Sequence, residues 1–174
     1  MFFLQMAGFP GSGKSTLAKE IANRTGAIII DHDVSKTALL ESMDTYHLES
    51  TNSGNISYHL DWAMIDFLLS LGHSVIFDSP CFYSEMVERG TMLAEKHHVK
   101  YKYIECLLNN VEEITYRLSN RKRMRSQIKQ IASVAAFNEW INNSKKPSNT
   151  NYLVVESGNP LYSYIDDVIN YLNE

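Results

Sequence analysis

The feature that most constrains the fold of this chain is a glycine-rich stretch near its N-terminus, which fits the pattern G-x-x-x-x-G-K-[ST]. Its glycines allow positive φ angles, so that successive N–H groups can point inward and form a nest for an anion. A helix that begins near Lys14 adds unpaired N–H groups and the positive end of its dipole at the same point. We expect Lys14 to reach the β- and γ-phosphates of a nucleotide and the Ser15 hydroxyl to bind Mg²⁺. The residues expected to contact the nucleotide are Gly8, Pro10, Gly11, Ser12, Gly13, Lys14, Ser15 and Thr16.

The segments on either side of this loop are those that the pattern requires. The apolar run 2–7 before the loop is long enough for a buried strand, and apolar residues recur at helical spacing after it. Those helical positions are Leu17, Ala18, Ile21 and Ala22. The order strand, glycine loop, helix therefore predicts a Walker A loop that binds ATP, with Mg²⁺ as its metal.

Length and composition indicate one globular domain that spans residues 1–174. Of its 174 residues 44% are hydrophobic, yet no apolar run approaches the roughly 20 residues that span a bilayer. The N-terminus has no basic region before its apolar run, which leads directly into the loop, so we expect a cytoplasmic protein with no membrane contact. The two cysteines, Cys81 and Cys106, are too few for a disulfide framework and are expected to be reduced and buried.

The net charge of −4 argues against long nucleic acid as the main partner, because proteins that bind a duplex usually carry a basic face. The positive charge is nevertheless concentrated in one short segment. Its members are Arg117, Arg121, Lys122, Arg123 and Arg125.

Apolar runs and helical periodicities alternate along the chain. Strands are predicted at 2–7, 27–30, 74–77, 99–108 and 152–155. Helices are predicted from 14 to Gly26, then at 35–43, 56–71, 84–97, 111–125, 127–143 and 162–172. The helix 56–71 has its apolar set at Leu60, Ala63, Met64, Phe67, Leu68 and Leu71. This alternation predicts an α/β fold of three layers, in which helices cover both faces of a parallel sheet and ligands bind at the carboxyl ends of its strands.

Three features together resemble the small P-loop kinases of the adenylate-kinase-like group. They are the loop, the acids that end the second strand, and the run Leu-Gly-His-Ser-Val-Ile-Phe-Asp at 71–78. The group includes polynucleotide 5′-kinase, zeta-toxin-type, gluconate and chloramphenicol kinases, and such chains are often described as AAA domains. The resemblance implies a P-loop NTPase fold with a five-stranded parallel sheet of order 2-3-1-4-5 and a short helical lid at about 117–130.

The resemblance also implies that an acid after the second strand orients the acceptor hydroxyl and takes its proton. Asp33 is our candidate for this base, and Asp31 for a structural or Mg²⁺-water contact, although either could instead be a helix N-cap. Lys36, one turn later, is similar to a basic residue of the group that holds a substrate phosphate, and could equally be solvated.

By the same resemblance, Asp78 is the Walker B acid, which holds Mg²⁺ together with Ser15. A cap or a loop contact is the alternative for this residue. The sequence that follows, Ser79-Pro80-Cys81, departs from the residues usual in the group, so the wall on the acceptor side is expected to differ.

The basic segment resembles the lid of the group in its Arg117-Leu118-Ser119-Asn120-Arg121 spacing. The resemblance implies that Arg117 stacks on adenine and that Arg121 contacts the phosphates, which suits a planar cation with a fork of donors. Arg123 and Arg125 would neutralise charge in the transition state. The alternative for all of them is a solvated basic face.

Two further sets of residues carry weaker signals. Gly158 and Asn159 follow the fifth strand, where the loop of the group passes the adenine ring, although a turn requires these residue types anyway. Tyr58, Trp62 and Phe82 could line the acceptor pocket, but aromatic residues at helical spacing are more often core.

The sequence therefore favours a kinase that transfers the γ-phosphoryl group of ATP to a hydroxyl of a small molecule or nucleotide. Lys14, Asp33, Arg121 and Arg125 would be its catalytic residues. An ATP-binding regulatory protein without transfer activity and a nucleic-acid 5′-hydroxyl kinase are the alternatives. The acceptor and the oligomeric state are not predicted.

Overall fold

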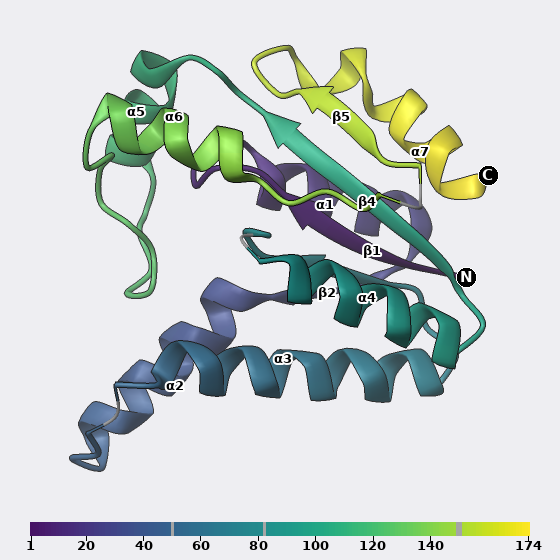
Figure 1. The fold of residues 1–174 in the computed structure, drawn as a ribbon, viewed down its shortest axis with the longest axis horizontal. Coiled ribbons are helices and arrows are strands. Elements are labelled where there is room, and N and C mark those ends of the chain that lie inside the picture. The colour runs from purple at the N-terminus through teal and green to yellow at the C-terminus, as the bar shows by residue number, and fades with distance from the viewer. Residues whose placement is uncertain (50, 82, 149–150) are drawn as a thin grey trace.

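A parallel sheet forms the centre of the computed structural model, which describes residues 1–49, 51–81, 83–148 and 151–174 (Figure 1). Its strands are β1 (Phe2–Ala7), β2 (Ile28–Asp31), β3 (Val75–Asp78), β4 (Lys100–Leu107) and β5 (Leu153–Glu156). They pair in the order β2-β3-β1-β4-β5, which confirms the predicted order. The strand that leads into the glycine loop therefore lies at the middle of the sheet.

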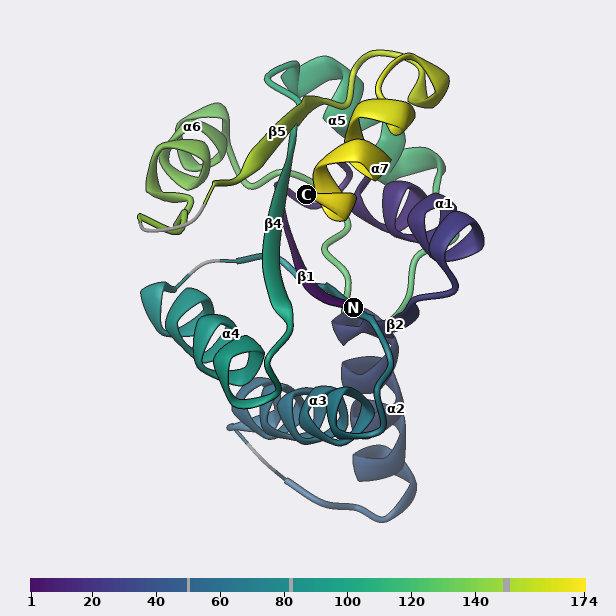
Figure 2. The ribbon, with the colours of Figure 1, turned by 90° about the vertical axis from the view of Figure 1, so that its right-hand side faces the viewer.

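Helices cover both faces of this sheet (Figure 2). On one face lie α1 (Lys14–Thr25) and α7 (Ile165–Asn173), which follows the short 3-10 turn Leu161–Ser163. On the other face lie α3 (Ser53–Ser70) and α4 (Ser84–Lys96). The helix α2 (His32–Thr45) starts at the carboxyl end of β2 and packs on α3, whereas α5 (Val111–Asn120) and α6 (Val134–Asn143) form a separate cluster around Phe9.

Alternation along β1 divides the core into these two halves. Leu4 and Met6 pack with α1 and α7, and Phe3 packs on the opposite face with α3 and α4. Every residue of β1 is buried, as expected for a strand covered on both sides. Gln5 is the polar exception, and its amide is satisfied by the Tyr101 hydroxyl at 2.8 Å and by Cys81 Sγ at 3.2 Å.

The buried face of α3 is not the one that the sequence analysis predicted. Of the predicted apolar set only Leu68 is partly buried, and Leu60, Met64, Phe67 and Leu71 are each at least 50% exposed. The buried residues of α3 are instead Ser57, Asp61, Trp62, Ile65 and Leu69. Because this helix carries apolar residues around most of its circumference, periodicity alone does not select a face. Contacts that are distant in sequence do so: the Trp62 ring packs edge-on against Phe3 and Phe77.

The predicted helices 111–125 and 127–143 are also too long. The helix α5 ends at Asn120, Arg121 adopts an extended backbone, and α6 begins only after the Ser133 side chain caps it by accepting from the Ala136 N–H. The chain between 121 and 133 descends from α5 towards the start of α2 (Figure 1). Hydrogen bonds between Ser126 and Thr37 hold it there in place of a continuous helix. No helix within the described residues is long and apolar enough to cross a membrane.

Candidate active site

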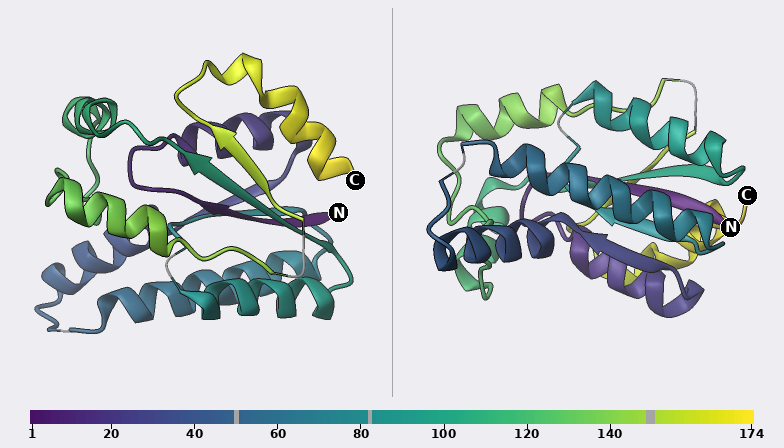
Figure 3. Two further views of the ribbon diagram at one scale, coloured as in Figure 1. Left: turned by 45° about the horizontal axis from the view of Figure 1, so that its top comes forward. Right: turned by 90° about the horizontal axis from the view of Figure 1, so that it is seen from below.

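A cavity of about 1410 Å³ opens at the carboxyl ends of β1, β2 and β3. The glycine loop and the N-terminus of α1 form one end of it, and residues of α2, α3 and α4 form the other. The chain from Tyr116 to Ile128 contributes a third wall. It covers most of the lid predicted at about 117–130 and is called the lid below, although its closure over a ligand stays a prediction. Figure 3 shows that the elements which supply these walls meet at one edge of the sheet. The cavity thus lies where ligands bind in open parallel sheets.

The glycine loop has the backbone conformation that an anion nest requires. Gly8, Gly11 and Gly13 have φ angles of 133°, 89° and 95°, which residues with a Cβ rarely adopt. A Cβ atom at Gly8 would lie 2.4 Å from the Cys106 carbonyl oxygen, so only glycine fits there. No side chain caps α1 at Gly13. The first N–H groups of α1 are therefore available to a ligand.

Lys14 lies inside this loop and not in solvent. Its side chain is buried, and Nζ donates to the Gly8 carbonyl oxygen at 2.8 Å and to the Phe9 carbonyl oxygen at 3.3 Å. Lys14 thus binds carbonyl oxygens of the loop, and the N–H groups of the loop do not take part in these contacts. The ammonium group is thus held within the loop, beside the place where phosphates would bind.

Ser15, Asp78 and Asp31 form an acidic pocket next to the loop. Ser15 lies close enough to the Asp78 carboxylate for its hydroxyl to lower the pKa of that acid. Burial raises the pKa of Asp78, although Lys14 and the hydrogen bond from Ser15 partly oppose this. Burial, together with the charge of Asp78, also raises the pKa of Asp31 to about 6. Two neighbouring carboxylates that are costly to ionise fit a site for a divalent cation, which would offset their charge.

A Mg²⁺ site does not require more protein ligands than these. Among the described residues, no group of three or more His, Cys, Asp and Glu side chains could hold a metal ion by itself. Mg²⁺ usually keeps several waters and takes one or two protein oxygens together with phosphate oxygens. Ser15 and Asp78 match such a sparse donor set.

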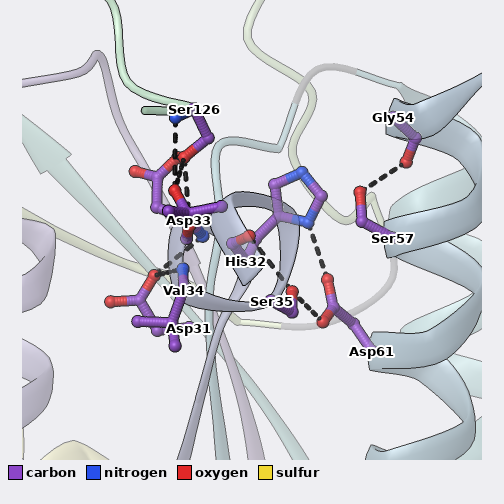
Figure 4. A network of polar contacts seen from close by, with 10 residues as sticks. Asp31, His32, Asp33, Val34, Ser35, Gly54, Ser57, Asp61 and Ser126 are labelled. Carbon is purple, nitrogen blue, oxygen red and sulfur yellow. Dashed lines mark hydrogen bonds and ion pairs between the residues drawn. The ribbon is translucent and has the colours of Figure 1, made fainter. Parts of the chain in front are cut away.

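The two acids after β2 are placed differently (Figure 4). Asp31 is the N-cap of α2, and its Oδ1 accepts from the N–H groups of Asp33 and Val34. Asp33 lines the cavity and is contacted by the lid: Ser126 Oγ lies 2.9 Å from its Oδ1, and Gln127 Nε2 donates to its Oδ2 at 3.0 Å. Asp31 is therefore the helix cap, both acids line the cavity, and the role of Asp33 as base stays a prediction.

Arg117 and Arg121 have different partners within the protein. Arg117 donates to Glu113 at 2.7 Å and to the Ser157 carbonyl oxygen at 3.2 Å, and a Cβ on Gly13 would meet its Nη1 at 3.8 Å. Arg121 donates to the Ile128 carbonyl oxygen. Its buried Nε has no partner among the described residues. Both side chains line the cavity, and their contacts with a nucleotide stay a prediction.

Arg125 is directed away from the cavity. Its guanidinium pairs with Asp44 near the end of α2 and lies 3.4 Å from the Leu40 carbonyl oxygen. Neither Arg125 nor Arg123, which donates to the Gln127 carbonyl oxygen, is part of the cavity wall. In this arrangement Arg125 ties the lid to α2, and a role in charge neutralisation would require it to leave Asp44.

The remaining predicted residues lie at the two ends of the cavity. Asn159 lines its wall beside the loop after β5, and Gly158 sits next to it without lining the wall. Tyr58, Trp62 and Lys36 line the end formed by α2, α3 and α4, where Trp62 is also part of the core. Phe82 lies outside the described residues.

Sequence reasoning missed four residues that the structure brings to this site. Ser126 and Gln127 contact Asp33 from the lid, whereas the prediction placed them in or beside helices. His32 lines the cavity, and Asp61 binds it from α3. One signal in the sequence could have indicated this pair. Asp61 is a charged residue within a mostly apolar helix, and a buried carboxylate needs a partner.

Comparison with known families agrees with this geometry. A family profile described as AAA domain matches residues 4–147. The chain belongs to this AAA domain family. The match covers the glycine loop, both acidic strand ends and the whole lid, and no curated protein matches the chain.

Solved structures show the same fold at low sequence identity. A sugar kinase from Janibacter sp. HTCC2649 is 18% identical, with a TM-score of 0.67 over 99% of this chain and 94% of the other. APS kinase CysC from Mycobacterium tuberculosis, in complex with AMPPNP and APS, is 15% identical, with a TM-score of 0.63 over 99% and 97%. Kti12 from Chaetomium thermophilum, in complex with ADP-AlF3, is 13% identical, with a TM-score of 0.66 over 98% of each chain. The fold of this AAA domain is therefore that of the small P-loop kinases in the adenylate-kinase-like group.

Proposed function

We propose that this AAA domain is a Mg²⁺-dependent phosphotransferase that moves the γ-phosphoryl group of ATP to a hydroxyl of a small molecule. The observation that carries the proposal is a single cavity with an uncapped phosphate loop at one end and the Asp33 carboxylate on its wall towards the other. A triphosphate on the loop and a hydroxyl near Asp33 would share this enclosed space. Kinases, including a sugar kinase and APS kinase, are among the proteins that share the fold, which adds support.

The nucleotide end would be held by main chain and cations. The loop N–H groups and Lys14 would bind the phosphates, and Arg117 would lie against the base, beside the loop that carries Gly158 and Asn159. Ser15 and Asp78 are the residues that would hold Mg²⁺, which supplies charge neutralisation on the phosphate oxygens when bound. Arg121 has an unused buried donor, Nε, which would suit a phosphate oxygen.

The transfer step would depend on Asp33. Its carboxylate would accept the proton of the acceptor hydroxyl while the hydroxyl oxygen bonds to the γ-phosphorus and the bond to the β–γ bridging oxygen breaks, which leaves ADP. The hydrogen bonds from Ser126 and Gln127 do not exhaust its lone pairs, so an acceptor can still bind to it. Because those donors belong to the lid, a lid in place over the cavity would also orient the base.

Acceptor-stimulated ADP release tests this function directly. Wild-type protein with ATP and Mg²⁺ is assayed against a panel of sugars, nucleosides, aminoglycosides and 5′-hydroxyl oligonucleotides. Asp33→Asn should lower the stimulated rate about 1,000-fold or more while the affinity for ATP stays within about twofold. Lys14→Ala should instead lower both the stimulated rate and the affinity for ATP, since it removes a phosphate contact.

A nucleotide-dependent regulator is the competing function. Kti12, which was solved in complex with ADP-AlF3, shares this fold and is not named as a kinase. Such a regulator would hydrolyse ATP slowly at a rate that no acceptor changes. A flat response across the whole acceptor panel, with ATP binding intact, would contradict the kinase proposal.

A further inference from the structure

A buried polar network lies behind the cavity wall, at the start of α2 (Figure 4). His32 Nδ1 is 2.6 Å from Asp61 Oδ2, and their side chains are 5% and 2% exposed. The Ser35 hydroxyl lies 2.5 Å from the second oxygen, Asp61 Oδ1. Both oxygens of the carboxylate are thus used within the protein. The network joins the first turn of α2 to the middle of α3.

The His32 ring is fixed in orientation by two contacts. Asp61 binds it in the plane of the ring, and Tyr58 stacks on its face with ring centroids 3.7 Å apart and planes 12° apart. An ionised carboxylate only accepts hydrogen bonds, so Nδ1 carries a proton and Nε2 is the nitrogen left for another partner. Figure 4 shows this second nitrogen pointing away from Asp61. Since His32 lines the cavity, that partner can be a ligand.

The network buries a carboxylate on a largely apolar face of α3. Asp61 lies on the same helix face as Trp62, Ile65 and Leu69, where an apolar side chain would pack without the cost of burying a carboxylate. The network therefore orients a single imidazole at considerable cost. Support of this kind is what holds a binding group in place before its ligand arrives.

We propose that His32 determines the acceptor of the reaction, by binding through Nε2 a second hydroxyl next to the one that Asp33 receives. His32 and Asp33 are consecutive residues in the first turn of α2, and both line the same cavity. The substrate class is then a polyol with neighbouring hydroxyls, such as a sugar or a nucleoside. This inference rests on the proposed kinase function.

The chemistry of the surroundings favours a hydroxyl over a charged group. A hydroxyl can donate to a neutral imidazole and accept from a charged one, so it suits His32 in either state. An anion at the same place would meet the negative charge of Asp61 behind the ring and of Asp33 beside it. A phosphate or carboxylate elsewhere on the acceptor would remain compatible with Lys36, which lines the same wall.

Two substitutions of His32 separate its two nitrogens. The side-chain amide of His32→Asn occupies the place of Nδ1, so this variant keeps a partner for Asp61 and lacks the Nε2 that is proposed to bind the acceptor. The longer His32→Gln places an amide near Nε2 and loses the contact with Asp61. Melting temperature and affinity for ATP are measured for both, to show that the fold and the nucleotide end are unaffected.

The polyols are D-ribose, D-glucose and adenosine. For each one that the wild type phosphorylates, ³¹P NMR first locates the new phosphate, and its deoxy partner is the analogue that lacks the hydroxyl on the adjacent carbon. For the polyol of each such pair, His32→Asn should lower kcat/KM roughly 10- to 100-fold, and His32→Gln should lower it less. For the deoxy partner, both variants should stay within about threefold of the wild type. An equal loss for both members of a pair would overturn the proposal, because His32 would then act through the fold alone.

A second readout does not depend on turnover. In protein labelled with ¹⁵N at histidine, the His32 Nε2 resonance should shift on addition of one or more of the three polyols in the presence of AMPPNP and Mg²⁺. Its deoxy partner should shift it less. If none of the polyols shifts this resonance at millimolar concentration, the assignment of His32 is wrong even when a kinase activity exists. If the resonance shifts but no acceptor stimulates ADP release, the polyol site at His32 is supported and the proposed transfer reaction is wrong.

Discussion

The side chain of Asp31 accepts a hydrogen bond from the backbone N–H of Asp33 at 2.9 Å, so the first of these two acids fixes the position of the second. Asp31 ends β2 and caps α2, and Asp33 faces the cavity from the first turn of that helix. The sheet edge therefore sets the place of the proposed base through a single residue.

Burial of Asp31 beside Asp78 also leads to an unusual dependence of stability on pH, although the capping hydrogen bonds from Asp33 and Val34 act in the opposite direction. The raised pKa of Asp31, about 6, means that the folded chain binds more protons than the unfolded chain between the ordinary pKa of 3.8 and about 6. The contribution of Asp31 to the free energy of unfolding is therefore largest at low pH and decreases as the pH rises through this window. Asp31→Asn keeps an oxygen for the cap but cannot ionise. Its free energy of unfolding, measured with urea in the absence of Mg²⁺, should therefore decrease less between pH 4 and pH 7 than that of the wild type. Parallel curves for wild type and variant would contradict the shift.

The close approach at Gly8 should make this position intolerant of alanine. Gly8→Ala combines a φ of 133° with a Cβ 2.4 Å from the Cys106 carbonyl oxygen, and should destabilise the fold by about 3 kcal/mol or more. Gly72→Ala is the control, because Gly72 also has a positive φ but no atom within 4 Å of its Cβ position. It should cost about 1–2 kcal/mol from backbone strain alone. Chemical denaturation compares the two, and equal losses would show that the clash at Gly8 is relieved.

The two arginines of the lid should have unequal effects on catalysis. Arg121→Ala removes a side chain that lines the cavity and should lower kcat about 30-fold or more. Arg125→Ala removes an exposed pair with Asp44 and should leave kcat within about threefold. ADP release under saturating ATP measures both. A comparable loss for Arg125→Ala would indicate that this side chain leaves Asp44 and enters the site when nucleotide binds.

The face of α3 that is buried can be tested with neighbouring residues. Ile65→Ala should lower the free energy of unfolding by about 2–5 kcal/mol, because Ile65 is 0% exposed. Met64→Ala should change it by less than about 0.5 kcal/mol, because Met64 is 50% exposed. The reverse order of effects would favour the face that periodicity predicted.

Local chemistry explains what could be predicted from the sequence. The glycine loop needs particular residue types at fixed spacing, and β1, β2 and β3 are apolar runs that end in the loop or in acids, so the sheet and the nucleotide end follow from short segments. The resemblance to small P-loop kinases supplied the strand order, which the structure confirms.

The acceptor side could not be read in this way, since its geometry depends on contacts between distant segments. Lid residue Ser126 meets Asp33 across 93 positions, and Asp61 meets His32 across 29. The helical periodicity of 121–133 is overridden by the contacts of the lid with α2. On α3, an apolar residue is available on almost every side, so the buried face is chosen by its neighbours.

The helix α2 begins at the residue after β2 ends, with no connecting loop. Successive residues of a helix are turned by about 100° from one another, so His32 and Asp33 leave the first turn of α2 in different directions, while both still line the same cavity. Deleting or adding one residue at this turn would change the positions of the Asp31 cap, the His32 imidazole and the Asp33 carboxylate together. A substitution at 32 or 33 can therefore alter one of these groups by itself, whereas an insertion or a deletion at this turn moves all of them.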